Sequence, residues 1–284
     1  MSRVPLDREE LQRRLPEFYS SIAVVDTTGS TNADLLARSA DVAADRTVLI
    51  AEHQDAGRGR HARVWVSPAR AQLAMSVLLR FPGVDPSILG WLPLSTGVAV
   101  AEAVATVLST SRTGSPAATG ADWAGPAFGV GLKWPNDVLL DGKKICGILA
   151  EVGQAVPDPV VVVGLGLNVS LTADELPVPT GTSLALAGFD IDRTELALEI
   201  LRSFADVLRG WSENNWDTTD LAVRYRQRST TIGRRVRAEL PGGHTVEGVA
   251  DTVDDEGRLL IVSDGELLAV SAGDVTHLRA VPGH

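Results

Sequence analysis

The chain has 284 residues and a mass of 30.0 kDa, which suggests one large domain or a main domain with a small one. Its composition is 44% hydrophobic and 22% charged, so wholesale disorder and low-complexity or collagen-like repeats are excluded. The formal net charge is −10, whereas duplex DNA or an anionic membrane requires a basic surface. We therefore expect no nucleic-acid partner and no membrane partner.

Three features of the sequence predict a cytoplasmic protein. The single cysteine, Cys146, has no partner for an internal disulfide, and a lone thiol is typical of a reducing compartment. Residues 1–18 mix charged and apolar side chains, unlike a signal peptide. We also find no apolar run of the roughly 18 residues that a membrane span requires.

The first half of the chain alternates strand and helix patterns. Strands are expected over residues 21–26, 47–52 and 73–79, and helices over residues 93–108 and after an N-cap at Ser30 or Thr31. Residues 109–129 are rich in Ser, Thr, Gly and Ala without periodicity, which predicts a surface loop. The second half opens with strands at residues 130–133, 144–152 and 159–169, followed by a helix over residues 194–211.

The pattern changes near residue 230. Short alternating segments separated by glycine-containing turns follow, at residues 236–240, 245–253, 258–262, 267–270 and 275–278. Strands of this length and spacing are typical of a small antiparallel barrel. We therefore expect a main domain over residues 1–230 and a small domain over residues 231–284.

The most informative segment is the glycine-arginine stretch at residues 52–65. Arg58, Arg60 and Arg63 lie within six residues, and from residue 53 on Asp55 is the single acidic residue beside them. Alternating glycines allow a close backbone approach and guanidinium groups reach anions, so the stretch indicates an anion clamp, although a solvated basic loop has the same composition. It also matches G-x-G-x-x-A, but no helix follows, which argues against a dinucleotide-binding fold.

Two lysines provide a second source of positive charge. Lys133 ends one predicted strand, and Lys144 begins another eleven residues later. If these strands are hairpin neighbours, both ammonium groups can face one pocket, whereas the simpler alternative is a pair of surface lysines. Cys146, in the same apolar strand, is interpreted as a core residue.

The glycine pair at residues 164 and 166 permits close approach of another backbone or a flat ring, as would a buried turn. The sequence has no G-x-x-x-x-G-K-[ST], G-x-S-x-G or H-E-x-x-H motif and no paired cysteines. Motif-bearing P-loop NTPases, α/β-hydrolases and zinc enzymes are therefore excluded.

Taken together, these stretches closely resemble the biotin protein ligase family. The resemblance rests on residues 29–32, 54–65, 133–137, 143–151 and 164–168, in the family's order and spacing, and extends from about residue 22 to the end. It implies an α+β fold in which helices flank a central mixed or antiparallel sheet, as in the class II synthetase-like biotin/lipoyl ligase domain. A small SH3-like barrel at the C-terminus belongs to the same pattern.

The resemblance also implies roles for individual residues. Those implied to bind biotin are Ser30, Thr31, Asn32, Gln54, Gly57, Arg58, Gly59, Arg60, Lys144 and Gly147. Those implied to bind the nucleotide are Arg58, Arg60, Arg63, Trp65, Lys133, Asn136 and Asn168. Lys144 and Arg60 are the implied catalytic residues, and the resemblance identifies no metal ligands. One departure is Ala62, where the family commonly has glycine.

The implied activity is ATP-dependent conversion of biotin to biotinyl-5′-AMP, aided by Mg²⁺. The biotinyl group then passes to one lysine of a biotin carboxyl carrier domain in a biotin-dependent carboxylase. The alternatives are a lipoate or octanoate ligase or transferase of the same fold, a biotin-responsive regulatory protein, and a catalytically silent binding module. Only about 20 residues precede the first predicted strand, too few for a winged helix-turn-helix domain, so we expect the form without one.

Overall fold

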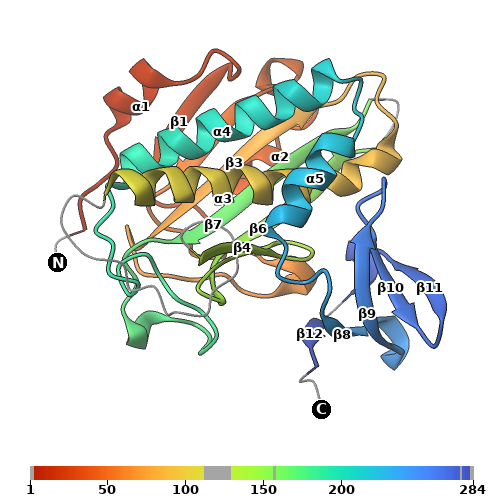
Figure 1. Cartoon of the computed structure of the whole chain (residues 1–284). Coiled ribbons are helices and arrows are strands. Elements are labelled where there is room, and N and C mark those ends of the chain that lie inside the picture. The colour runs from red at the N-terminus through yellow and green to blue at the C-terminus, as the bar shows by residue number, and fades with distance from the viewer. Residues whose placement is uncertain (1–2, 112–128, 156–157, 276, 282–284) are drawn as a thin grey trace.

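The computed structural model describes residues 3–111, 129–155, 158–275 and 277–281 (Figure 1). Within these ranges the chain forms a seven-stranded sheet flanked by helices and a separate five-stranded antiparallel sheet. The predicted fold class is confirmed. The predicted loop at residues 109–129 lies almost wholly outside the described residues.

The main sheet has the strand order β1-β2-β3-β7-β6-β5-β4. Its strands are β1 (Ser21–Val25), β2 (Thr47–Ala51), β3 (Gln72–Arg80), β4 (Val130–Lys133), β5 (Asp137–Leu140), β6 (Lys143–Gln154) and β7 (Val160–Asn168). Of the described pairs in this sheet, β1 and β2 alone are parallel, because a helical crossover joins them. The remaining pairs are antiparallel, and β3, β7 and β6 form the long centre of the sheet.

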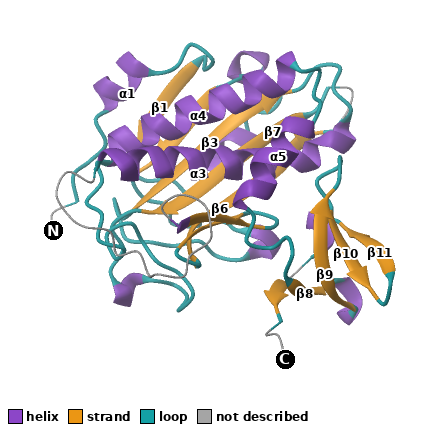
Figure 2. Cartoon of the chain, viewed as in Figure 1, coloured by secondary structure: helices purple, strands orange, loops and turns teal. Residues whose placement is uncertain are grey.

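The helices are α1 (Arg8–Arg14), α2 (Thr31–Leu36), α3 (Leu92–Thr110), α4 (Arg193–Glu213) and α5 (Thr219–Arg228). Short 3₁₀ helices, of which η2 (Arg60–Ala62), η3 (Pro86–Trp91) and η7 (Ala272–Asp274) matter below, lie in the connections. Figure 2 shows α3 and α4 side by side across one face of the main sheet. Helix α2 lies on the opposite face, against β3, β6 and β7.

The alternation of side chains along the central strands decides what each face holds. Met75 and Val77 of β3 belong to the large core under α3 and α4, whereas Leu78 belongs to the small core under α2. On the α2 side the same strands carry small residues, among them Ser76, Gly164 and Gly166. Because side chains point alternately to the two faces, these small residues leave space beside α2 rather than in the main core.

Helix α3 is largely buried, and it bears on the expectation that the chain has no apolar run long enough to span a membrane. Together with η3 it forms a helical stretch, Pro86–Thr110, that is long and apolar enough by length and composition to cross a membrane, but most of its apolar part is buried inside the molecule. The sequence thus holds a stretch of that length and composition, and the structure packs it as a core helix. Its few polar residues are accommodated internally, since Ser95 and Thr96 donate their hydroxyls to the carbonyl oxygen of Leu92 at 3.0 and 2.6 Å.

The second sheet has the order β11-β10-β9-β8-β12. Its strands, β8 (Arg235–Glu239), β9 (Thr245–Val253), β10 (Leu259–Ser263), β11 (Glu266–Val270) and β12 (His277–Ala280), each overlap a predicted segment. This unit docks on the main sheet domain through two indoles. Trp91 and Trp134 donate to the carbonyl oxygens of Asp254 and Gly257 at 2.9 and 3.1 Å.

Three elements, α1, β5 and α5, were not predicted. Among the seven residues of α1 only Leu11 is buried, and α5 buries three residues, so neither carries a clear apolar period. Strand β5 has four residues and occupies the turn between the two lysine-bearing strands. Lys133 and Lys144 are therefore not on neighbouring strands, because β5 lies between β4 and β6.

Candidate active site

A cavity of about 320 Å³ opens on the α2 side of the main sheet. Its described lining comes from the start of α2, the arginine loop, the β4–β5 turn, β6, β7 and residues 177–180. Five cationic side chains, Arg58, Arg60, Arg63, Lys133 and Lys144, line it together with a single carboxylate, Asp137. In a protein with a net charge of −10, this is a strongly positive enclosure.

The first wall is built by the N-terminus of α2. Ser30 is the N-cap, and its Oγ accepts from the amide of Ala33 at 3.5 Å. The cap turns Thr31 into the cavity, where its amide and its hydroxyl contact Oε1 of Gln54 at 2.8 and 3.0 Å. Asn32 follows in the first helical turn. The structure therefore brings the predicted residues Ser30, Thr31, Asn32 and Gln54 together at this wall.

The arginine loop is a tight hairpin next to this wall. The amide of Trp65 donates to the carbonyl of Gly57 at 2.8 Å, and that of Gly59 donates to the carbonyl of Arg63 at 2.7 Å. A Cβ on Gly57 would lie 2.2 Å from the Trp65 carbonyl oxygen, so glycine is required there. A Cβ on Gly59 would make only ordinary contacts, the nearest at 3.6 Å from Arg63.

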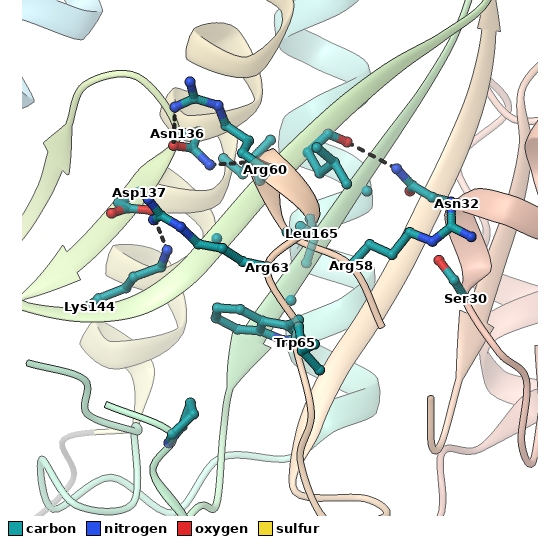
Figure 3. A pocket seen from close by; sticks show the side chains of 18 of the residues that line it. Ser30, Asn32, Arg58, Arg60, Arg63, Trp65, Asn136, Asp137, Lys144 and Leu165 are labelled. Atoms are coloured by element: carbon teal, nitrogen blue, oxygen red, sulfur yellow. Dashed lines mark hydrogen bonds and ion pairs between the residues drawn. The ribbon is translucent and has the colours of Figure 1, made fainter. Parts of the chain in front are cut away.

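The arginines of the loop point in different directions (Figure 3). Arg58 extends toward Ser30 and Asn32, whereas Arg60 and Arg63 lie on the side of Asn136 and Asp137. The enclosure therefore has two positively charged regions, one near α2 and one near the β4–β5 turn.

Arg60 also connects the loop to the second sheet. Its Nη2 donates to the carbonyl oxygens of Ala272 and Val275, the latter at 2.8 Å, and its Nη1 donates to Oδ1 of Asn136 at 3.3 Å. Burial lowers the pKa of the Arg60 guanidinium from its usual value, an effect that nearby Asp137 opposes. The guanidinium nevertheless stays charged, because arginine is not deprotonated in proteins.

The loop has two adjacent residues in the left-handed region. His61 has φ 53° and Ala62 has φ 56°. A Cβ in this region crowds the backbone at a cost of roughly 1–2 kcal/mol, which glycine avoids. The departure at Ala62 that the sequence revealed therefore falls at a strained position.

We expect Ala62→Gly to raise the free energy of unfolding by about 1 kcal/mol, because it relieves this strain. Denaturant titration followed by intrinsic fluorescence measures the change. Ala56→Gly in the preceding turn is the matched control, since Ala56 has no positive φ, and it should lower stability. A loss of stability in Ala62→Gly equal to that in the control would contradict the strain argument.

Lys144 lies at the centre of the second positively charged region. Its Nζ is 2.5 Å from Oδ1 of Asp137 and 5.3 Å from the centroid of the Trp65 ring. The Trp65 indole lies against Gly147 and Gly166, a cross-strand pair of β6 and β7, and its Nε1 donates to Gln72 at 2.6 Å. Of the two β7 glycines, Gly166 is thus the one that accommodates a flat ring, and that ring is the indole of Trp65.

The β4–β5 turn supplies Lys133 and Asn136. Lys133 ends β4 and lines the cavity. The Asn136 amide donates to the carbonyl of Ile148 at 2.8 Å, while its oxygen accepts from Arg60. The two lysines therefore share one enclosure, as predicted, although β5 separates their strands.

Two of the predicted site residues do not line the cavity. Gly57 belongs to the arginine loop and supports its geometry, but it is not among the lining residues. Asn168 has an exposed fraction of 4%, and its amide donates to the carbonyl of Thr182 at 2.9 Å. The structure thus gives Asn168 a partner within the protein instead of a position in the enclosure.

The lining also includes residues that sequence reasoning missed. Asp137 directly follows the predicted Asn136, so its position in the segment 133–137 was a signal that it lines the site. Ser76 lies on the small-residue side of β3, and Pro177, Val178 and Thr180 come from a connection with no distinctive pattern.

Cys146 is fully buried on β6. Burial raises the pKa of its thiol to about 12, and the effect of Lys144 opposes this only in part. We therefore expect the folded protein to be unreactive toward a thiol-specific disulfide reagent at pH 8, and to take up one equivalent after unfolding in denaturant. Rapid stoichiometric labelling of the folded protein would contradict the core position.

No group of three or more His, Cys, Asp or Glu side chains suited to a metal occurs among the described residues. Asp137 is the one carboxylate among the described lining residues, and it pairs with Lys144. The side chains that line the enclosure thus do not fit a metal held by protein ligands alone.

Comparison with known proteins identifies the class of protein that has this main sheet, this cavity and this second sheet. Residues 23–168 match the Biotin/lipoate A/B protein ligase family, and residues 231–278 match the Biotin protein ligase C terminal domain. A solved structure of biotin protein ligase from Aquifex aeolicus in complex with biotin and ATP has the same fold. It aligns with a TM-score of 0.70 at 24% identity, over 93% of this chain and 100% of that chain.

Individual relatives identify the family within this class. The chain is 46% identical over 282 residues to the biotin–[acetyl-CoA-carboxylase] ligase of Mycobacterium tuberculosis, covering 98% of this chain and 97% of that protein. It is 30% identical over 259 residues to the bifunctional ligase/repressor BirA of Escherichia coli, covering 90% of this chain and 74% of that protein. The chain belongs to the biotin protein ligase family.

Proposed function

We propose that this protein activates biotin with ATP to biotinyl-5′-AMP and transfers the biotinyl group to one lysine of a biotin carboxyl carrier domain. The observation that carries the proposal is the convergence of five cationic side chains around one enclosure in an acidic protein. Both reactants are anions, so they repel each other unless fixed positive charges neutralise them. The similarity to the mycobacterial ligase supports biotin as a substrate, and the Aquifex aeolicus structure of the same fold, a complex with biotin and ATP, supports ATP as the second.

We assign the biotin end of the cavity to the α2 wall. Ser30, Thr31, Asn32 and Gln54 offer buried hydrogen-bonding groups there, as a polar ring system requires. Arg58, which extends toward this wall, is assigned to the biotin as well. Gly57 and Gly59 give the loop its shape, and Gly147 forms the floor beside Lys144.

The nucleotide is assigned to the other positively charged region. Arg60, Arg63, Lys133 and Asn136 surround it, and Trp65 separates it from the sheet. Asn168 takes part only if it exchanges its present partner, Thr182.

Lys144 and Arg60 are the proposed catalytic residues. Lys144 holds the biotin carboxylate against the α-phosphate, so that a carboxylate oxygen attacks phosphorus and pyrophosphate leaves. Arg60 neutralises the phosphates and leaves its carbonyl partners in the second sheet to do so. The adenylate is a mixed anhydride; the carrier amine attacks its carbonyl carbon, AMP departs and the amine proton is released.

Mg²⁺ enters this proposal as a companion of ATP. Because the cavity offers one paired carboxylate, the ion would be held mainly by the substrate phosphates and water, as Mg²⁺ commonly is. When bound it neutralises charge on the leaving pyrophosphate.

We further propose a division into residues 1–230 and 231–284, since α5 ends at Arg228 and β8 begins at Arg235. The lone buried thiol supports a cytoplasmic location. The acidic composition supports partners other than nucleic acid or membrane.

The test is incubation with ATP, Mg²⁺, labelled biotin and a biotin carboxyl carrier domain, followed by mass spectrometry of the carrier. We expect label on one lysine, dependent on ATP, with release of pyrophosphate and AMP. The same reaction with lipoate or octanoate addresses the nearest alternative. Efficient transfer of lipoate without transfer of biotin would overturn the proposal.

A further inference from the structure

A continuous chain of hydrogen bonds runs along the α2 wall and ends at a glutamate outside the cavity. Oε2 of Glu151 accepts from Nδ2 of Asn32 at 2.7 Å, and Oδ1 of Asn32 accepts from Oγ of Ser76 at 2.6 Å. Oγ of Ser76 is 2.7 Å from Oγ1 of Thr31, which is 3.0 Å from Oε1 of Gln54. Four of these residues line the cavity, whereas Glu151 does not.

The Glu151 carboxylate fixes the direction in which these hydrogen bonds are donated. A carboxylate and a backbone carbonyl can only accept, and both Glu151 and the Leu149 carbonyl, at 3.2 Å, contact Nδ2 of Asn32. The Asn32 amide oxygen therefore faces Ser76, so Ser76 must donate its hydroxyl hydrogen to Asn32. The Gln54 oxygen is fixed in the same way, because it accepts from the Thr31 amide at 2.8 Å.

Ser76 has then used its one hydrogen on Asn32, so its oxygen is left as an acceptor. The Thr31 hydroxyl also carries one hydrogen and has two acceptors within reach, the oxygens of Ser76 and Gln54, and the Gln54 oxygen already accepts from the Thr31 amide. Whichever acceptor the Thr31 hydroxyl takes, an acceptor position stays open on a wall where Thr31 is 3% exposed and Ser76 is 1% exposed. A ligand N–H group at this wall would donate to that open position.

We propose that Glu151 is a positioning residue for biotin recognition, because through Asn32 it orients the hydroxyls so that the wall presents acceptors to the ligand. The inference rests on the proposed function. The cyclic urea of biotin carries two N–H donors, whereas the dithiolane ring of lipoate carries none. Glu151 thereby contributes to the choice between these substrates without touching either.

The sheet itself is adapted to this chain. A Cβ on Gly164 would lie 2.0 Å from Oδ1 of Asn32 and 3.0 Å from Oγ of Ser76. Any larger residue at position 164 would separate the two groups. One glycine of the apolar β7 motif thus has a role in keeping the Asn32–Ser76 link.

The test compares Glu151→Met, which removes the acceptor at similar length, with Glu151→Gln, which keeps an acceptor oxygen. In pyrophosphate-release assays, Glu151→Met is expected to raise the KM for biotin about tenfold, the size of one hydrogen bond to a charged group. The KM for ATP and kcat should not change, and the preference for biotin over lipoate should fall. Glu151→Gln should stay close to the unmodified protein.

Two controls separate positioning from general damage. Glu102→Met removes a similarly half-buried glutamate that accepts from Arg224 at 2.6 Å; neither residue lines the cavity, so the KM for biotin should not change. Ser76→Ala interrupts the same chain, so its effect and that of Glu151→Met should be less than additive in a double-mutant cycle. Ser76→Ala and Glu151→Gln also test the inference if Glu151→Met does not fold.

An unchanged KM for biotin in Glu151→Met would overturn the inference, as would equal increases for biotin and ATP or equal impairment in Glu151→Gln. The unmodified protein separates the two levels of the argument. If it releases no pyrophosphate in response to biotin, the proposed function fails; if it does and Glu151→Met behaves identically, only the role of Glu151 fails.

Discussion

Lys144→Ala is expected to slow adenylate formation by about 100-fold or more, the usual cost of losing one well-placed charged donor from a water-excluded site. Lys144 is half-buried, it contacts Asp137 at 2.5 Å, and it lies over the Trp65 ring, so its ammonium group is held at one place before any ligand arrives. Pyrophosphate release at saturating biotin and ATP measures the effect. Near-normal release by the variant would remove Lys144 from the mechanism.

The neighbouring lysine offers a matched control. Lys143 is exposed and does not line the cavity, although it belongs to the same strand. Successive residues of a strand face opposite sides, so Lys143→Ala changes the net charge equally without changing the enclosure. We expect its activity to remain that of the unmodified protein. A comparable loss in both variants would point to an effect of overall charge instead of a positioned group.

The contiguous part of the site was predictable from sequence, because its chemistry is local. The arginine loop closes through backbone hydrogen bonds between residues that are near in sequence, so its three arginines reach the same cavity. Ser30 is a residue type that favours the N-cap of a helix. The periodicity of β3 and α4 likewise follows from one-sided burial. These features depend on spacing within a dozen residues, which a sequence displays directly.

The remaining part depends on the path of the chain. Residues 177–180 reach the cavity because the segment passes β6, where the Lys144 amide donates to the Thr180 carbonyl at 3.0 Å. No local pattern encodes that crossing. The same holds for Asn168, whose partner Thr182 is brought by this segment, and for Glu151, whose link to Asn32 joins β6 to α2.

Gly166→Ala is expected to lower the free energy of unfolding by about 1–3 kcal/mol, the usual cost of overpacking, because a Cβ there would lie 2.3 Å from Nε1 of Trp65. The indole would have to leave the floor of the cavity and give up its bond to Gln72, so adenylate formation should fall as well. Denaturant titration measures the stability change.

Two further variants separate this clash from the general effect of adding a methyl group to a glycine. Gly210→Ala in α4 adds the same methyl group where no atom lies within 4 Å, and it should raise stability by about 0.5–1 kcal/mol through helix propensity. In a Trp65→Ala background the clash is absent, so Gly166→Ala should then cost much less. If the cost is the same in both backgrounds, the Trp65 indole does not lie on Gly166, and the assignment of this floor to the nucleotide end of the cavity loses its physical basis.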